Sequence, residues 1–191
     1  MNFPLIKSFL KNNLRLFKKF FQLILNRLDK RIFKKDTYPL VNFVTENANW
    51  SIKWDGIYLQ KNLNKDSKNH SFDLSDIPII NSKKRVIHFG SQYMWVDWEK
   101  LLPKNNKYVV SFFHGKYQDG TATSKHIDEF IKTQKSIYKV ITGSSLIFKR
   151  LKKWGIPESK LIRIPIGVDT KLFNIPTLKQ KEKIRKTLGF K

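Results

Sequence analysis

The first 35 residues carry hydrophobic side chains at alternating spacings of three and four, which is the pattern of one stripe along an α-helix. The stripe consists of Phe3, Ile6, Leu10, Leu14, Phe17, Phe21, Ile24, Leu28 and Ile32. The longest uninterrupted apolar run here is Leu23–Leu25, far shorter than the roughly 20 residues that a spanning helix needs. The pattern therefore predicts an amphipathic helix that does not cross a bilayer.

From residue 38 onward the pattern changes to short apolar runs separated by stretches with helical periodicity. The runs that predict strands are 39–46, 84–90, 107–115, 139–145 and 160–167. Most of them are continuous rather than alternating, which is typical of strands buried on both faces. The two clearest helices between them are predicted at 124–135 and 145–154, the second of which ends before a glycine and a proline. Residues 59–76 are predicted to be a long polar excursion.

Strands that alternate with crossover helices predict an α/β fold with a Rossmann-like, mostly parallel sheet flanked by helices. The basic amphipathic helix is expected to precede this domain. In open sheets of this kind, ligands bind beyond the carboxyl ends of the strands. The small and polar residues at those ends are Glu46, Asn47, Gly90, Ser91, Gln92, His114, Gly115, Lys116, Gly143, Ser144, Ser145, Gly167 and Asp169. Neither G-x-G-x-x-G nor G-x-x-x-x-G-K-[ST] occurs, so a self-contained dinucleotide or P-loop site is not expected.

The charge favours anionic partners. The chain has 38 Lys and Arg against 15 Asp and Glu, a formal net charge of +23. Through residue 35 there are ten basic residues and one acid, Asp29. Three interpretations of this segment stay open: a helix lying on an anionic membrane surface, a helix docked on the core with its basic face in water, and a nucleic-acid-binding helix, which is the least favoured. An AT-rich gene also produces a lysine-rich chain, so charge alone does not assign a function.

Cysteine, histidine and the placement of basic residues limit which kinds of functional site and which cellular compartment are expected. The absence of cysteine excludes disulfides, thiolate zinc sites and a cysteine nucleophile, and it fits a reducing cytoplasm. The four histidines lie far apart in sequence without an H-x-x-x-H pair, so no metal site is predicted. Lysine and arginine interrupt what would be the apolar part of a signal peptide. The expected location is the cytoplasm, peripheral to the inner face of the membrane.

The stretch KVITGSSLIFKRLKKWGIPESKLIRIPIGVDTKLF, residues 139–173, resembles the end of the N-terminal domain of family-4 glycosyltransferases of the GT-B fold. That family has a strand, a serine-rich turn, a helix ending in Gly-Ile/Val-Pro, and a strand of the form I-P-x-G-V-D-x-x-x-F in this order. YVVSFFHG, residues 108–115, falls where the family has a strand ending in His-Gly. One departure is Ile166, a position that is often asparagine in the family.

The resemblance implies one half of a GT-B fold, in which residues 37–174 form the acceptor-side domain and 175–191 a linker helix toward a donor domain that this sequence lacks. The basic helix would occupy 1–36. The implied function is the acceptor-binding half of a retaining glycosyltransferase, inactive alone, that transfers a sugar from a nucleotide-sugar donor to a polysaccharide or lipid-linked acceptor. The alternative is a non-catalytic basic module that binds an anionic membrane or nucleic acid.

By the same resemblance, His114 would be the catalytic residue that touches the transferred sugar near the reacting carbon. Lys116 would neutralise a phosphate, and Ser144 and Ser145 would donate to acceptor hydroxyls. The remaining candidate substrate-binding residues are Ser91, Gln92, Gly115 and Asp169. No metal and no cofactor are expected, because the nucleotide sugar is a substrate. The expected partners are that donor, a glycan or lipid-linked acceptor, a separately encoded donor domain, and an anionic membrane surface that residues 1–35 would contact.

Overall fold

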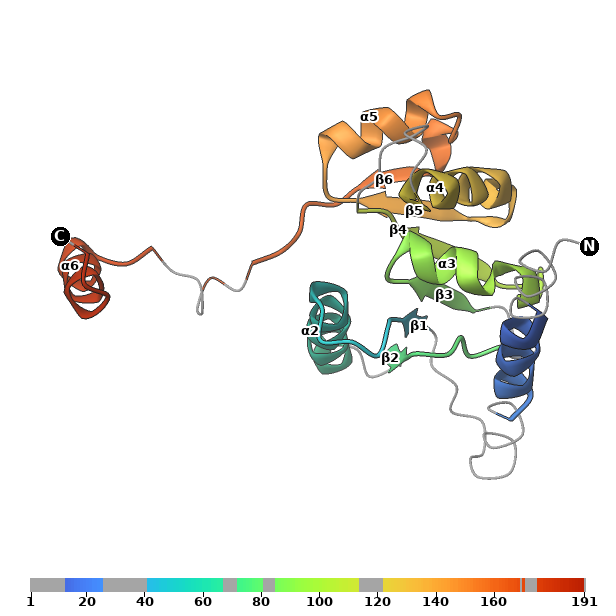
Figure 1. Cartoon of the computed structure of the whole chain (residues 1–191), viewed down its shortest axis with the longest axis horizontal. Helices are drawn as coiled ribbons and strands as arrows, with labels where there is room; N and C mark the ends of the chain where they lie inside the picture. Colours follow the sequence, from blue (N-terminus) through green and yellow to red (C-terminus); the bar gives the residue numbers. More distant parts are fainter. Residues whose placement is uncertain are drawn as a thin grey trace, which may run out of the picture.

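A computed structural model of the chain describes residues 13–25, 41–66, 72–80, 85–113, 122–168, 170 and 175–190. These residues form an α/β structure whose six strands are all parallel and pair in the order β2-β1-β3-β4-β5-β6 (Figure 1). The strands are β1 (Val41–Val44), β2 (Phe72–Ser75), β3 (Val86–Phe89), β4 (Lys107–Ser111), β5 (Lys139–Thr142) and β6 (Leu161–Arg163). The helices are α2 (Ser51–Asp66), α3 (Gln92–Trp98), α4 (Ala122–Thr133), α5 (Ser145–Lys153) and α6 (Leu178–Thr187), with residues 13–25 forming a further helix near the N-terminus.

The prediction of a parallel, Rossmann-like sheet flanked by helices is confirmed. All five predicted strands are present, as β1, β3, β4, β5 and β6. Two elements were missed within the first half of the domain. Strand β2 adds to the sheet beyond β1, and α2 covers 16 residues that partly overlap the stretch expected to be a polar excursion. The prediction of irregular chain over 59–76 is therefore wrong for most of that range.

The main hydrophobic core lies between one face of the sheet and helices α3, α4 and α5 (Figure 1). Alternate residues of β3 to β6 point into it, among them Phe89 and Val110, which are both fully buried. Trp95 of α3 is the largest fully buried side chain among the described residues, and its Nε1 donates to Thr133 Oγ1 of α4 at 2.8 Å. The tryptophan therefore fills the core and also joins two helices, with its polar atom satisfied.

Helix α2 packs on the opposite face, near β1 and β2. Gly56 makes this possible, because a Cβ at that position would lie 2.5 Å from Leu74 Cδ1. Gly90, after β3, allows a second close approach, since its Cβ would lie 2.6 Å from Ile52 Cγ2. The two glycines thus set the distance between α2 and the sheet.

The turns around α5 follow the predicted pattern. Ser144 is the N-cap, and its side chain accepts a hydrogen bond from the backbone of Ile147 at 3.4 Å. Gly155 ends the helix with a φ of 89°, a left-handed conformation that glycine adopts without strain. Pro157 and one turn of 3-10 helix then lead into β6.

The two terminal segments differ in how they relate to the sheet. The helix of residues 13–25, called here the N-terminal helix, lies against α3, whereas the rest of the predicted helix 1–36 lies outside the described residues. Helix α6 begins with a capping box at Thr177 and stands apart from the sheet in Figure 1, with every residue exposed. It occupies the range predicted for a linker helix, and its role as a linker stays a prediction.

Candidate functional site

The strand order places a topological switch point between β1 and β3. The chain leaves β1 in one direction to form β2 and returns on the other side of β1 to form β3, so the connections diverge at this pair. Crevices for ligands form at the carboxyl ends of strands that flank such a point. Thr45 follows β1 there, and Gly90, Ser91 and Gln92 follow β3.

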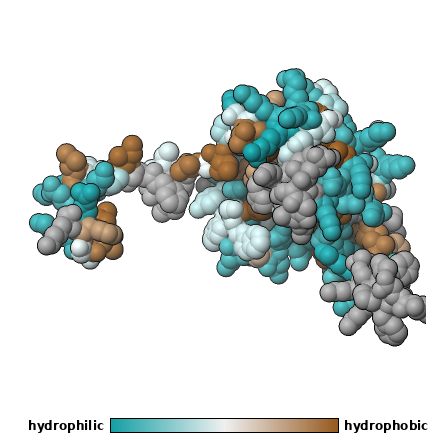
Figure 2. Space-filling view, turned by 45° about the horizontal axis from the view of Figure 1, so that its top comes forward, coloured by the Kyte–Doolittle hydropathy of each residue, from teal (hydrophilic) through white to brown (hydrophobic). Residues whose placement is uncertain are grey.

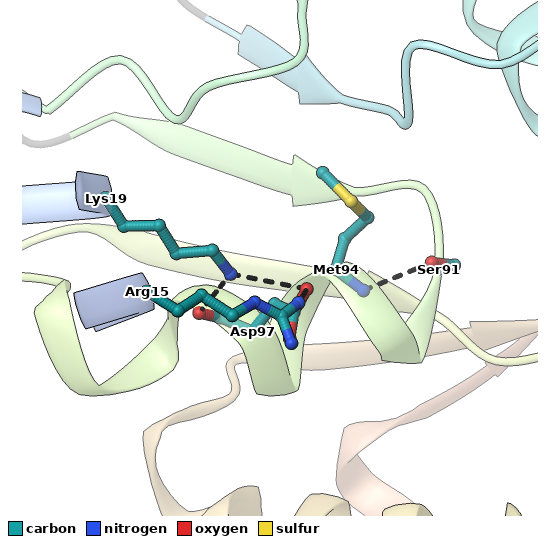
Figure 3. Close-up of polar contacts among 5 residues, drawn as sticks. All are labelled: Arg15, Lys19, Ser91, Met94 and Asp97. Atoms are coloured by element: carbon teal, nitrogen blue, oxygen red, sulfur yellow. Dashed lines mark hydrogen bonds and ion pairs between the residues drawn. The ribbon is translucent and has the colours of Figure 1, made fainter. Parts of the chain in front are cut away.

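Ser91 and Gln92 are buried within this edge, each only 1% exposed. Ser91 is the N-cap of α3 and accepts a hydrogen bond from the backbone of Met94 at 3.2 Å (Figure 3). Gln92 Oε1 accepts from the backbone of Phe113, just beyond β4, at 3.4 Å. These contacts connect the start of α3 to the neighbouring strand exit. Both residues therefore hold the start of α3 and the end of β4 in place at the carboxyl edge of the sheet. Their direct contact with a substrate stays a prediction.

Ser144 and Ser145 lie on the same edge of the sheet, at the end of β5, and both are exposed. Ser145 is the first residue of α5, where backbone N–H groups have no partner within the helix. Such groups, together with the helix dipole and exposed hydroxyls, favour an anionic or hydroxyl-rich ligand. Among the predicted site residues that the structure describes, these two serines are exposed to solvent.

A hydrophobic surface adjoins the two serines. We call it the β6 patch, and it consists of Leu146, Ile164, Ile166 and Val168, which are between 51% and 65% exposed. Figure 2 shows hydrophobic side chains along the chain that leaves β6 toward α6. Ile166 lies over the strand-end glycine, because a Cβ on Gly143 would lie 3.3 Å from Ile166 Cγ1. The edge therefore offers polar groups and an apolar surface side by side.

Four of the predicted site residues lie outside the described residues: His114, Gly115, Lys116 and Asp169. The described chain reaches the end of β4 through Phe112, which is fully buried, and Phe113. It also includes Gly167 and Val168, directly before Asp169. The roles of these four residues stay predictions that rest on the resemblance.

The structure brings together a pair that sequence analysis did not predict, Tyr93 of α3 and His126 of α4. Their rings stack with centroids 4.1 Å apart and an interplanar angle of 26°. Burial lowers the pKa of His126 below its usual range, although a hydrogen bond from the imidazole to the backbone of Gln92 and the carboxylates of Asp97 and Glu129 oppose this. Its Nε2 is buried and has no hydrogen-bond partner in the described structure.

A second unpredicted pair lies on the sheet itself, on the face opposite the main core. His88 of β3 and Ser111 of β4 form a hydrogen bond of 2.9 Å between Nε2 and Oγ. The ring of Phe43 packs edge-on against the imidazole at 4.7 Å. Burial lowers the pKa of His88 to about 4. A histidine and serine in contact resemble a base and nucleophile, but a base with so low a pKa activates a hydroxyl poorly near pH 7. The pair is better explained as a polar contact that joins two strands.

Thr45 adds a further buried polar atom at the switch point. The residue is 5% exposed, and its Oγ1 has no hydrogen-bond partner among the residues the structure describes. Buried hydroxyls are usually satisfied, so an unpaired one at a strand exit marks a place where a ligand or water can bind. In sequence, Thr45 lay within the run 39–46 that predicted the first strand, with no further signal.

Two kinds of site find no support in the described part of the chain. No three His, Asp or Glu side chains there are grouped so that they could hold a metal ion. Likewise, no described helix combines the length and the apolar character needed to span a membrane. Comparisons with protein-family models, curated proteins and solved structures return no match to this chain.

Proposed function

We propose that the chain is the acceptor-side half of a retaining, metal-independent glycosyltransferase that uses a nucleotide sugar as donor and a polysaccharide or lipid-linked glycan as acceptor. The observation that carries this proposal is the unit β5–α5–β6. In it, Ser144 caps the helix and Gly155 ends it in a left-handed conformation, in the order that the family pattern has. The parallel sheet around this unit agrees with a Rossmann-like half of such an enzyme.

The site would use two kinds of contact. Ser144, Ser145 and backbone amides at the start of α5 would bind hydroxyl or phosphate oxygens, and the β6 patch would bind an apolar part of the ligand. His114 would act at the transferred sugar, as the resemblance implies. Most donor contacts in this family lie on the second domain, so this half should bind nucleotide sugars weakly and transfer no sugar without that domain.

Amide chemical-shift mapping of the full chain tests the proposal. Uridine- and guanosine-diphosphate sugars at millimolar concentration should shift the amides of Ser144 and Ser145. Ser136 provides an internal control, because it is exposed and lies just before β5, at the other end of the strand. Shifts at Ser136 with none at the two serines would place binding at the wrong edge and reject this site.

Calorimetric titration of the same ligands tests the half-enzyme interpretation. We expect dissociation constants in roughly the millimolar range, because half of a two-domain cleft lacks most nucleotide contacts and does not exclude water. Micromolar affinity for the chain alone would show that the donor site is complete within it. That result would contradict an acceptor-side half while leaving the α/β fold untouched.

A further inference from the structure

The N-terminal helix is held on α3 by its basic side. Arg15 Nη2 lies 2.5 Å from Asp97 Oδ2, and Lys19 Nζ lies 3.3 Å from the same oxygen (Figure 3). Lys19 also donates to the backbone carbonyl of Asp97 at 2.9 Å and lies 4.8 Å from the centre of the Trp98 ring. Its side chain is only 14% exposed, and Leu23, one turn further along, packs against the main core. These contacts determine which side of the helix faces the domain.

The hydrophobic stripe lies on the other side of this helix. At about 100° per residue, Phe17 and Phe21 each point roughly 160° away from Lys19. The members of the stripe within the described helix remain exposed: Leu14 (61%), Phe17 (66%), Phe21 (53%) and Ile24 (37%). Phe20 and Leu25 flank the stripe and are also about half exposed. We call these six residues the outer face.

This arrangement is the reverse of an ordinary surface helix. Such a helix buries its apolar stripe against the core and leaves its lysines in water. Here a lysine and an arginine contact the domain, while three phenylalanines face outward. Contiguous exposed apolar surface of this kind marks an interaction site. The helix is thus docked on the domain, as the second of the three interpretations left open by the sequence has it, but through Arg15, Lys19 and Leu23 rather than through its apolar stripe.

We propose that the outer face binds the surface of an anionic lipid bilayer. Charge selects this occupant: residues 1–35 contain ten basic residues and one acid, and Lys18, beside the outer face, is exposed. An anionic bilayer accepts phenylalanine and leucine at its acyl boundary and attracts lysine and arginine at its headgroups. A second copy of the chain would bring two strongly basic segments together, and nucleic acid would leave the phenylalanines exposed. The proposal does not depend on the glycosyltransferase assignment.

The docking contacts also orient the domain on the bilayer. Helix α3 starts at the carboxyl edge of the sheet, where Ser91 caps it, and runs away from that edge. Asp97 lies six residues further along, which is about 9 Å at 1.5 Å per residue. Figure 3 shows Arg15 and Lys19 at the end of α3 remote from Ser91. The membrane contact is therefore at the amino edge of the sheet, and the candidate site is held away from the lipid surface.

Flotation with vesicles tests the binding. We expect the full chain to float with vesicles of equal phosphatidylglycerol and phosphatidylcholine, and much less with pure phosphatidylcholine or at high salt. The double substitution Phe17→Ser and Phe21→Ser should weaken binding about tenfold or more. The matched control is Ile184→Ser with Leu188→Ser, which removes two exposed apolar side chains at the same spacing from α6 and its C-cap and should have no effect.

Three results would overturn the proposal. The first is equal flotation of the wild type and the phenylalanine variant. The second is an equal loss of binding in the α6 control, which would indicate a general effect of hydrophobicity. The third is a wild-type dimer in sedimentation that becomes a monomer in the phenylalanine variant while vesicles bind neither form, because the outer face would then be an interface between copies.

Lipid quenching tests the orientation. The sequence contains no cysteine, so single substitutions Lys18→Cys and Ser145→Cys can each carry one fluorescent label. Lipids with a quencher near the headgroup should quench the label at position 18 strongly and the label at position 145 weakly. Equal quenching at both positions would show that the carboxyl edge also touches the bilayer, and would refute the orientation.

Discussion

Protonation of His88 should destabilise the fold by a predictable amount. Burial lowers its pKa from 6.5 to about 4, so the unfolded chain binds this proton more readily than the folded chain. The stability that comes from keeping His88 neutral in the folded chain is fully present above pH 6.5. It is lost progressively as the pH falls toward 4. A difference of 2.5 in pKa corresponds to about 3.4 kcal/mol in the free energy of unfolding. This is a large fraction of the ~5–15 kcal/mol that stabilises a typical domain.

Urea unfolding followed by tryptophan fluorescence at several pH values between 7 and 4 measures the effect. The comparison is with His88→Gln, which cannot take up a proton in this range. Between pH 7 and pH 4, wild type should lose about 3 kcal/mol more of its free energy of unfolding than the variant does, while acid effects common to both chains cancel.

Ser111→Ala is the matched control. It removes the hydrogen-bond partner of His88 but leaves the imidazole buried, so the chain should lose some stability at every pH and keep the steep dependence. If the free energies of unfolding of wild type and His88→Gln changed in parallel between pH 7 and 4, the reasoning would be refuted. Such a result would mean that the folded histidine titrates near its ordinary pKa.

Three further predictions concern packing. Gly90→Ala should lower the free energy of unfolding by about 1–3 kcal/mol in urea titrations, since its Cβ would lie 2.6 Å from Ile52 Cγ2. Gly167→Ala, with nothing within 4 Å of its Cβ, is its control, and equal losses would argue against overpacking. Gly155→Ala should cost about 1 kcal/mol in the same assay because of its φ of 89°, and no loss would show that the helix ends differently. Phe112→Ala should cost about 3–5 kcal/mol, measured as a drop in thermal unfolding temperature, and a small drop would contradict its burial in the core.

The sequence by itself determined the elements that have a strong local signal. The apolar runs that became β1, β3, β4, β5 and β6 were recognisable because strands buried on both faces are continuously hydrophobic. The ends of α5 were readable from a capping serine and a glycine, whose conformational preferences act within a few residues. The alternation of these elements was then enough to predict parallel pairing, and so the edge at which the candidate serines lie.

Weaker local signals explain the two missed elements. Strand β2 lies at the end of the sheet with Asp73 and Ser75 at alternate positions, so it lacks a continuous apolar run. Helix α2 contacts the sheet over a narrow strip around Gly56 and leaves Trp54, Tyr58 and Leu63 exposed. An element that buries little surface needs few apolar residues in register, and its pattern resembles that of a polar loop.

Tertiary structure decided everything that depends on contacts between distant residues. His88 and Ser111 are 23 positions apart, and only the register of β3 with β4 brings them together. The sequence contained the hydrophobic stripe of the N-terminal helix, but it could not show which side of that helix faces the domain. Asp97, 78 positions beyond Lys19, settles that question by binding the basic side. Helical periodicity is a property of one segment, whereas its orientation is set by a partner elsewhere in the chain.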